Sequence, residues 1–594
     1  MNPYGALRTH GTGTLRPSDA GSEVVLGGWV ASRRDHGGVV FLDLRDRSGV
    51  VQVVADPSAG EALSAAHEVR GEYVVLVRGS VRRRPEGMAN PALGTGEVEV
   101  AASSLEILSR ADTPPFPIED RVETDEALRL TYRYLDLRRP GVAHALQLRA
   151  RATSVMRRVM ESHGFLDIET PMLTRSTPEG ARDFLVPSRQ SPGSMYALPQ
   201  SPQLFKQLLM VAGMERYYQI VRCFRDEDLR ADRQPEFTQL DVEASFIDEE
   251  DVYALVEELM VALWRELLGV ELAVPFPRIA HAEALRRYGS DRPDLRFGLE
   301  LTDCGEVLAS TEAGVFASAL ASGGSVLALR LPGGGELTRR ELDGWQDFAK
   351  ARGAKGLAWA VVEPEGTLRS PLAKFLRPDE VKGLLEAADA EPGDVLFFAA
   401  GATRASQELL GAVRVALARQ RGLIPAGRWE FVWVTGFPLF NWDPERQRWD
   451  AEHHPFTAPD TASLARLEEA PGEALARAYD LTLNGTELGG GSMRISDREL
   501  QARVFALLGI SEQQAEEKFG FLLRGLSYGA PPHGGIAFGV DRLAMLLAGG
   551  SSLRDVIAFP KTQSGGDPLT GAPSPAEPGQ LAEVGLRLAA PPKR

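Results

Sequence analysis

Two strand-like segments, residues 217–224 and 237–243, flank a loop in which charged side chains crowd together. The first segment is rich in aromatic and β-branched residues, and the second alternates strictly between two kinds of side chain. This alternation places Gln239, Asp241 and Glu243 on one face of a strand. An amide and two carboxylates on one face of a core strand are costly unless that face lines a polar site. The pattern therefore predicts a β-hairpin that contributes one face to a binding site.

The loop between the two segments mixes arginines with carboxylates. Its charged residues are Arg225, Asp226, Glu227, Asp228, Arg230, Asp232 and Arg233. Such a loop is either a solvated hairpin tip or a clamp for a polyphosphate. Planar guanidinium groups suit phosphate oxygens, and neighbouring carboxylates hold them in orientation. The loop by itself leaves both interpretations open.

Three segments resemble the motifs of one enzyme class. Residues 224–241 resemble motif 2 of the class II aminoacyl-tRNA synthetases, residues 165–171 resemble motif 1, and residues 534–547, a glycine-broken strand that opens a helix, resemble motif 3. They follow in the expected order, and the resemblance, closest to the bacterial-type aspartyl-tRNA synthetases, covers nearly the whole chain. The resemblance implies a multidomain protein of mixed α/β (α+β) class. Its expected parts are an N-terminal OB-fold β-barrel, an antiparallel-sheet catalytic domain and an inserted α+β domain. The implied activity is that of an ATP-dependent, AMP-forming ligase that joins aspartate to tRNA.

Length and composition limit the alternatives. A chain of 594 residues predicts several domains, and 43% hydrophobic with 25% charged residues is typical of a soluble globular protein. A formal charge of −16 is not typical of a nucleic-acid-binding protein, so any basic groups that bind RNA must be clustered on one part of the surface. Two cysteines, Cys223 and Cys304, form neither a disulfide framework nor a zinc site, which indicates a reducing cytoplasm. The first residues show no signal pattern, and no run of about 18 apolar residues occurs, so we expect no membrane association.

The beginning of the chain has the pattern of a small barrel. Strand-like runs lie at residues 23–32, 38–44, 49–55, 73–83 and 97–108, with a short helix at 59–69. Five strands with one helix between the third and fourth predict an OB-fold, a fold that binds single-stranded bases by stacking them on aromatic rings. A lone aromatic residue in a strand more often packs in a core. The resemblance implies instead that this domain grips the anticodon through Arg34, Phe41 and Gln52.

Two loop positions bear on which tRNA is charged. His36 lies in the first barrel loop, where many strictly aspartate-specific bacterial enzymes carry leucine, and Gly87 lies in the loop after the fourth strand. Both features resemble the relaxed enzymes that charge tRNA(Asp) and tRNA(Asn) alike. These two tRNAs differ in the third anticodon base, which a polar imidazole with a small neighbour could tolerate. The alternative is that His36 is an ordinary turn residue.

Changes in composition and pattern divide the chain into segments. We expect an OB-fold anticodon-binding domain at 1–112, a hinge at 113–140, a catalytic domain in two parts at 141–293 and 426–564, an inserted α+β module at 294–425, and a C-terminal extension at 565–594. The polar loop at 176–183 is a surface loop or, by the resemblance, a lid that closes over the amino acid. The inserted module carries no acid–base cluster, and its chemistry cannot be read from the sequence.

A second hairpin, residues 478–489, supplies candidate metal ligands. Its two-residue Asn-Gly turn sets Thr482 opposite Glu487 and places Asp480 diagonally across on the same face. Two carboxylates on one face repel each other unless a cation or a proton lies between them. Asp480 and Glu487 therefore predict a Mg²⁺ site shared with substrate phosphates. The glycines at 489–491 then allow close backbone approach or form a bulge.

The resemblance assigns roles to individual residues. The implied catalytic residues are Arg225, Arg542 and Glu487. The residues implied to bind aspartate are Glu179, Gln203, Lys206, Arg225, Asp241, His453 and Arg494. Those implied to bind ATP are Arg225, Asp226, Glu227, Gln234, Glu487, Gly539, Val540, Asp541 and Arg542. The ammonium group would pair with Asp241 and Glu179, and the side-chain carboxylate with Arg494 and Lys206.

Two alternatives remain beside an aspartate ligase. An asparaginyl or lysyl ligase on the same scaffold is disfavoured by Arg494 beside Lys206, because neither a neutral amide nor an ammonium needs two cations. A non-catalytic RNA-binding paralogue would be expected to lose Arg225, Glu487 or Arg542, and all three are present. The expected partners are ATP, Mg²⁺, L-aspartate, tRNA(Asp) with tRNA(Asn) left open, and a second copy of the chain through motif 1.

Overall fold

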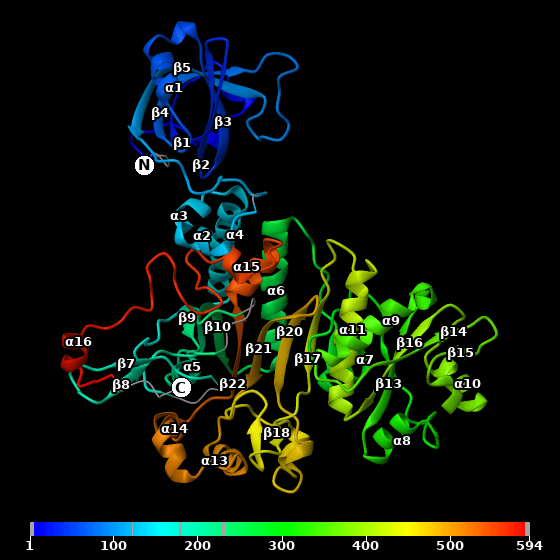
Figure 1. The fold of residues 1–594 in the computed structure, drawn as a ribbon. Coiled ribbons are helices and arrows are strands. Elements are labelled where there is room, and N and C mark those ends of the chain that lie inside the picture. Colours follow the sequence, from blue (N-terminus) through cyan, green and yellow to red (C-terminus); the bar gives the residue numbers. More distant parts are fainter. Residues whose placement is uncertain (1–4, 122, 177–180, 228–232, 589–594) are drawn as a thin grey trace. The chain divides into compact units, whose positions relative to one another are not determined.

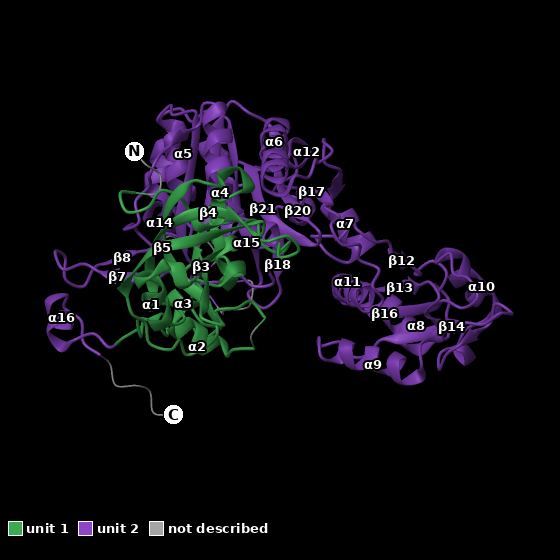
Figure 2. Cartoon of the chain, turned by 90° about the horizontal axis from the view of Figure 1, so that it is seen from above, with its two compact units in different colours: residues 1–147, 554–574 green, residues 148–553, 575–594 purple. Residues whose placement is uncertain are grey.

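The computed structural model describes residues 5–121, 123–176, 181–227 and 233–588. The chain divides into two compact units, residues 1–147 with 554–574, and residues 148–553 with 575–594 (Figure 2). Each unit has its own strands and its own hydrophobic core.

Five strands of the first unit close into a barrel in the order β1-β2-β3-β5-β4 (Figure 1). The elements are β1 (Glu23–His36), β2 (Val39–Asp46), β3 (Gly49–Ala55), α1 (Glu61–Glu68), β4 (Val74–Arg83) and β5 (Val98–Ser109). Alternate residues such as Leu26, Val30 and Leu42 point into the barrel and are fully buried. The predicted OB-fold is confirmed. The helix begins later than predicted because Asp56 caps a short 3₁₀ turn first.

Two short helices, α2 (Glu126–Thr131) and α3 (Arg133–Asp136), follow the barrel in the chain. The buried Arg133 side chain donates to the carbonyl oxygens of Arg554 at 2.6 Å and of Ile557 and Ala558 at 2.9 Å. These bonds attach a late segment of the chain to the first unit.

An eight-stranded sheet forms the centre of the second unit, in the order β11-β17-β20-β21-β22-β10-β9-β6. Its strands are β6 (Leu166–Asp167), β9 (Arg216–Phe224), β10 (Glu236–Ser245), β11 (Arg278–Ala280), β17 (Phe431–Thr435), β20 (Ala478–Leu483), β21 (Thr486–Met493) and β22 (His533–Gly539). Neighbours are antiparallel except at the two edges, where β11 pairs with β17 and β6 with β9 in parallel. The predicted antiparallel-sheet catalytic domain is confirmed. The strand predicted at 165–171 is shorter than expected, with only two residues in β6.

One face of this sheet packs against three helices, α4 (Pro140–Ser162), α6 (Glu249–Leu268) and α15 (Val540–Leu547). A single apolar cluster joins them to the strands and includes the fully buried Trp264 and Trp433. Strand β10 shows how the sequence divides the two faces, because Leu240 and Val242 enter this cluster while Asp241 points to the opposite face. The predicted alternation of β10 is therefore correct, and the polar face is left open for a site.

The inserted segment builds a second sheet, in the order β12-β13-β16-β14-β15. Its elements are β12 (Leu301–Asp303), α8 (Gly314–Ala321), β13 (Ser325–Leu331), α9 (Arg339–Lys350), β14 (Ala358–Val362), β15 (Leu368–Arg369), α10 (Pro378–Ala387), β16 (Val395–Gly401) and α11 (Thr403–Gln420). Two apolar clusters of its own lie within it, one around Trp345 and one around Phe316. The helix expected at 309–321 begins only at Gly314. The exact domain boundaries remain predictions.

The second unit contains further elements outside the two sheets described above. They are β7 (Leu185–Pro187), β8 (Met195–Ala197), α5 (Gln203–Val211), α7 (His281–Tyr288), β18 (Phe440–Asp443), β19 (Arg448–Ala451), α12 (Thr461–Leu464), α13 (Arg498–Leu507), α14 (Glu512–Leu526) and α16 (Pro578–Glu583). Within the part of the chain that the structure describes, no helix is both long and apolar enough to cross a membrane.

Candidate active site

Two adjoining cavities open on the polar face of the main sheet. The first, which we call the arginine cavity, has a volume of about 290 Å³ and contains Arg225, Arg233, Arg292 and Arg542. The second, the carboxylate cavity, has a volume of about 480 Å³ and contains Lys206, Asp241, His453, Asp480 and Arg494. Both cavities are also lined by Arg225, Glu227, Gln239, Glu487 and Ala537, so they meet along these residues.

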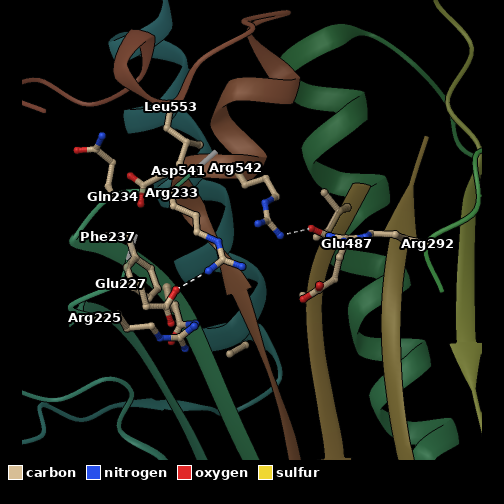
Figure 3. Close-up of a pocket in the computed structure, with 15 residues that line it drawn as sticks. Arg225, Glu227, Arg233, Gln234, Phe237, Arg292, Glu487, Asp541, Arg542 and Leu553 are labelled. Carbon is tan, nitrogen blue, oxygen red and sulfur yellow. Dashed lines mark hydrogen bonds and ion pairs between the residues drawn. The ribbon is translucent and has the colours of Figure 1, made fainter. Parts of the chain in front are cut away.

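The arginine cavity offers several guanidinium groups to one ligand (Figure 3). Arg542 lies in the first turn of α15 and donates from Nη1 to the carbonyl oxygen of Glu487 at 2.7 Å, which holds it over the cavity. Arg233 Nη1 lies 2.6 Å from the Glu227 carboxylate. The Arg225 guanidinium lies 5.0 Å from the ring centre of Phe237, and its buried Nε has no partner among the described residues. Guanidinium groups converging beside an aromatic ring suit a nucleoside polyphosphate.

The remaining residues predicted for ATP occupy different places. Gln234 and Gly539 line the arginine cavity, whereas Val540 is fully buried in the apolar cluster beneath it, and Asp226 is exposed and lines neither cavity. Asp541 reaches the cavity, but its Oδ2 accepts from the Thr238 amide at 2.7 Å and its Oδ1 from Arg149. Asp541 therefore anchors the start of α15 to β10.

Four buried charged groups face one another at the carboxylate cavity, and Lys206, Asp241 and Arg494 of these line it. Lys206 Nζ lies 2.7 Å from Asp241 and 3.2 Å from Glu243, and Arg494 forms two bonds of 3.0 and 3.1 Å with Glu243. None of the four is more than 5% exposed. Burial would raise the pKa of Glu243, but Arg494 and Lys206 outweigh it and lower this pKa to about 2. Burial raises the pKa of Asp241 despite Lys206. Two cations thus balance two carboxylates.

This balance changes one argument drawn from the sequence. Lys206 and Arg494 were expected to await a carboxylate of the substrate, yet each already pairs with a carboxylate of the chain. Such pairing is required because an unpaired buried charge is very costly. A ligand that enters must therefore exchange partners within the cluster.

His454 belongs to the same cluster. Its Nε2 lies 2.7 Å from Arg494 Nη1, and burial followed by the charge of Arg494 lowers its pKa well below the usual value. A neutral imidazole can accept the hydrogen bond from the guanidinium. The adjacent His453 lines the cavity from another direction, with its Nε2 3.7 Å from Asp480. Both side chains reach the carboxylate cavity, but they contact different groups there, Arg494 for His454 and Asp480 for His453.

The two carboxylates predicted to bind metal both face the cavities. Asn484 and Gly485 have φ angles of 52° and 81° and form the predicted two-residue turn, and Thr482 pairs with Glu487 as expected. Burial, and then the charge of Asp480, raises the pKa of Glu487. No group of three or more described histidine, cysteine, aspartate or glutamate side chains forms a metal site. Two carboxylates in a polar cavity beside arginines fit Mg²⁺, which uses one or two carboxylates together with substrate phosphates.

The glycines at 489–491 lie where a side chain would not fit. A Cβ at Gly489 or Gly491 would stand 2.3 or 2.1 Å from a carbonyl oxygen of β22, whereas a Cβ at Gly490 would stand 2.3 Å from Asp480 Oδ1. Close backbone approach, one of the two predicted reasons for these glycines, is therefore confirmed.

Replacing Gly490 with alanine should displace the Asp480 carboxylate and leave the sheet intact, because only the end of a side chain must move. For the activity that the sequence resemblance implies, we expect aspartate-dependent exchange between ATP and pyrophosphate to fall at least tenfold, with a small change in melting temperature. Gly491→Ala is the matched control, and its clash with a carbonyl oxygen should instead destabilise the fold by about 1–3 kcal/mol. Wild-type exchange in a folded Gly490→Ala variant would show that the placement of Asp480 is unimportant.

The predicted lid is the loop at residues 176–183. Glu179 lies in residues 177–180, outside the described residues. After this segment, the buried Gln200 donates to the Ala181 carbonyl at 2.9 Å and to Asp183 at 2.5 Å, and it accepts from the Ala181 amide at 3.1 Å. Gln203, from α5, lines the carboxylate cavity with a buried Nε2 that has no partner among the described residues.

The residues predicted to contact an anticodon lie in the first unit. Arg34 on β1 pairs with Asp43 at 3.0 Å and lies 3.4 Å from Gln52 on β3, and Phe41 stands opposite Arg34 on β2. The exposed His36 ring lies 6.0 Å from the Phe41 ring. Gly87, with φ of 80°, lies in the β4–β5 connection. In OB-folds the β2–β3 face and the β1–β2 and β4–β5 loops bind oligonucleotides.

Sequence reasoning missed several residues of the site. Glu243 was placed on the correct face of β10 but received no role, although it holds both cations of the carboxylate cavity. Arg292 lines the arginine cavity and Asp291 the carboxylate cavity, and no role was predicted for either residue. The alternation of β10 could have identified Glu243, whereas no local pattern indicates Arg292.

Comparison with known proteins agrees with this geometry. Residues 125–563 match the family model described as class II tRNA synthetases (D, K and N), and residues 24–108 match the OB-fold nucleic acid binding domain. The asparaginyl-tRNA synthetase from Pyrococcus horikoshii complexed with asparaginyl-adenylate has a TM-score of 0.55 and 20% identity, covering 92% of this chain and 96% of that one. This structure shows the same fold. The class defined by fold and site is thus that of the class II tRNA synthetases.

Closer relatives narrow the class. The aspartate–tRNA(Asp/Asn) ligase of Salinispora arenicola is 58% identical over 584 residues, which are 98% of this chain and 96% of the relative. That of Moorella thermoacetica is 57% identical over 586 residues, 99% of this chain and 98% of the relative. The chain belongs to the aspartate–tRNA ligase family.

Proposed function

We propose that this chain activates L-aspartate with ATP, forming aspartyl-adenylate and pyrophosphate, and transfers the aspartyl group to the 3′ end of tRNA with release of AMP. One observation carries the proposal. A cavity of arginines and a cavity of paired acids and bases meet at Arg225 and Glu487, where an amino-acid carboxylate can approach a phosphate.

The residues of the arginine cavity serve the first step. Arg225, at the junction, neutralises the α-phosphate that the aspartate carboxylate attacks, and Arg542 neutralises the γ-phosphate. Phe237 and Gln234 contact the nucleoside in this arrangement. Most of the rate enhancement comes from positioning and from fixed positive charge, as in phosphoryl transfer generally.

The carboxylate cavity selects the amino acid by an exchange of partners. The substrate ammonium pairs with Asp241, which frees Lys206 to turn towards the side-chain carboxylate beside Arg494. Glu243 stays with Arg494 and holds its fork in position. Asparagine would leave three cations to share Asp241 and Glu243, and lysine would leave four, an imbalance that is costly in a buried site.

Asp480 and Glu487 are the residues that would hold Mg²⁺. When bound, the ion neutralises charge on the phosphates of ATP. The exchange of radiolabelled pyrophosphate into ATP, measured with each amino acid in turn, tests the whole proposal. Aspartate alone should support exchange, and equal exchange with asparagine or lysine would overturn the assignment.

We further propose that the chain charges tRNA(Asp) and tRNA(Asn) alike. The exposed His36 stands beside the Phe41 ring with a glycine in the β4–β5 connection, and the curated relatives carry the name aspartate–tRNA(Asp/Asn) ligase.

Wild type and a His36→Leu variant should therefore differ in selectivity. Wild type should charge both tRNA transcripts. In the variant, kcat/KM for tRNA(Asn) should fall at least tenfold, while kcat/KM for tRNA(Asp) should stay unchanged. The ratio of kcat/KM for the two transcripts measures the effect, and aspartate-dependent exchange without tRNA serves as the control. A wild type that ignores tRNA(Asn) would show that this enzyme is strict.

We also propose that the chain acts as a cytoplasmic homodimer through the segment around β6. Leu166 and Leu173 there are 49% and 53% exposed, and large exposed apolar side chains mark interaction sites. Light scattering should give twice the mass of the chain, and Leu166→Glu with Leu173→Glu should give monomers.

A further inference from the structure

A third groove continues from the Arg292 side of the arginine cavity. It has a volume of about 390 Å³ and lies between α11, the loop after α7 and the turn of the β20–β21 hairpin, and we call it the α11 groove. Four arginines line it, which are Arg292, Arg404, Arg414 and Arg419. Only Arg292 also lines the arginine cavity, and the proposed reaction uses none of the other three.

The walls of the α11 groove are tightly packed. Helices α7 and α11 lie side by side (Figures 1 and 2), and the backbones of Gly289 and Gly411 touch. A Cβ added at Gly411 would stand 2.4 Å from the Gly289 carbonyl oxygen, and one at Gly289 would stand 2.1 Å from that of Gln407. The position of α11 relative to the loop after α7 is therefore well defined.

Arg414 places a buried positive charge at the base of the groove. It is 1% exposed, and its Nε and Nη2 donate to the carbonyl oxygens of Leu299, Asp294, Phe297 and Gly298 at 2.8 to 3.0 Å. Its guanidinium also lies between the rings of Tyr288 and Phe297, at 4.9 and 4.1 Å. No described carboxylate forms an ion pair with Arg414, and no described group accepts from its Nη1. Burial lowers its pKa to about 10, which still leaves it charged at neutral pH.

The other charged side chains of the groove leave it with an excess of positive charge. Arg419 is exposed and pairs with no described carboxylate, while Arg404 pairs with Glu408 at 2.6 Å and Arg292 comes no closer than 3.7 Å to Asp291. Asp294 also lines the groove, but its carboxylate forms two bonds with Arg296 at 2.9 and 2.7 Å. The arginines therefore exceed the carboxylates left to balance them, in a chain whose formal charge is −16.

We propose that the α11 groove binds a phosphate group. Arginine forks match phosphate oxygens, and a charge fixed at the base of a groove attracts an anion more strongly than one in open solvent. Arg292 lines both the groove and the arginine cavity, so a phosphate bound in the groove would lie next to the proposed reaction site. Its source, which rests on the proposed function, is either the backbone of an RNA acceptor strand or the pyrophosphate that leaves the first step. The inserted module thereby takes part in handling substrate through α11.

The test removes the two exposed arginines of α11 together. Arg404→Gln with Arg419→Gln leaves Arg414 and the fold in place. Arg339→Gln with Arg340→Gln removes two exposed arginines of α9 and is the charge-matched control. If the phosphate belongs to RNA, KM for a tRNA transcript should rise roughly tenfold and its salt dependence should weaken, since each phosphate contact adds to the slope. If it belongs to pyrophosphate, KM for pyrophosphate in the reverse reaction should rise instead. An α11 double variant that equals the α9 double variant in both constants would overturn the proposal.

Failure of the proposed function would look different. In that case wild type would charge no tRNA with any amino acid, while calorimetry with inorganic pyrophosphate and with a tRNA transcript would still compare wild type and the α11 double variant. Weaker binding of either probe by the α11 double variant supports the phosphate site. Equal binding of both probes overturns it, whatever reaction the chain catalyses.

Discussion

Replacing Arg494 with leucine should lower the kcat/KM for aspartate in exchange by about 30- to 5,000-fold. Losing one partner of a buried, hydrogen-bonded charge pair costs about 2–5 kcal/mol, and each ~1.4 kcal/mol is a factor of ten. The guanidinium would otherwise bind the side-chain carboxylate in the transition state for adenylate formation. ATP binding should survive, because Arg494 does not line the arginine cavity. Exchange kinetics and ATP titration measure the two effects.

The same substitution leaves Glu243 buried with Lys206 as its one remaining cation at 3.2 Å, so stability must be separated from activity. Arg494→Leu combined with Glu243→Gln removes both partners and should recover most of the melting temperature, because deleting a whole buried pair is often neutral. It should not recover aspartate activation. Normal activation by the single variant would show that Arg494 does not bind the substrate.

Glu487→Gln should abolish adenylate formation, and a higher ATP concentration should not restore it. The substitution keeps the shape of the side chain but removes the charge that would hold Mg²⁺ against the phosphates. Transfer of the aspartyl group from preformed aspartyl-adenylate to tRNA should suffer much less, since the β- and γ-phosphates have already left as pyrophosphate and only the α-phosphate remains. Single-turnover assays of the two steps make the comparison, and equal loss in both would indicate a structural role for Glu487.

The pH dependence of wild type gives an independent check on this carboxylate. Burial and Asp480 raise the pKa of Glu487, so as pH falls its charge is lost earlier than that of an ordinary glutamate. Exchange should therefore decline on the acid side at a higher pH than an exposed carboxylate would give. Added Mg²⁺ should move this decline to lower pH, because the cation and the proton compete for the same group. A decline that does not respond to Mg²⁺ would separate Glu487 from the metal.

The charge balance in the carboxylate cavity also changes how selectivity is explained. Two cations that wait for a dicarboxylic amino acid would be costly before the substrate arrives. In the structure they are paired with Asp241 and Glu243, so binding under the proposed function would replace one ion pair with another. Under the proposed function, the ammonium of asparagine would take Asp241 without bringing a side-chain carboxylate, so Lys206 and Arg494 would have to share Glu243.

Local patterns in the sequence determined the elements and much of the site. The alternation of β10, the Asn-Gly turn of the β20–β21 hairpin and the five barrel strands were all predictable, because each depends on side-chain periodicity or turn geometry within a few residues. The resemblance of the motifs added the family, since each motif is a contiguous segment.

Tertiary structure alone decided which charges meet. Glu243 and Arg494 are 251 residues apart in the chain, and Lys206 and Asp241 are 35 apart, yet each pair is buried and in contact. Likewise, only the folded chain brings Arg292 to the arginine cavity and encloses Arg414 in backbone carbonyl oxygens. A buried charge is stable only beside a compensating group, and sheet pairing and packing of distant segments determine which group that is. Periodicity tells which face a side chain takes, but its partners come from elements that no local pattern connects.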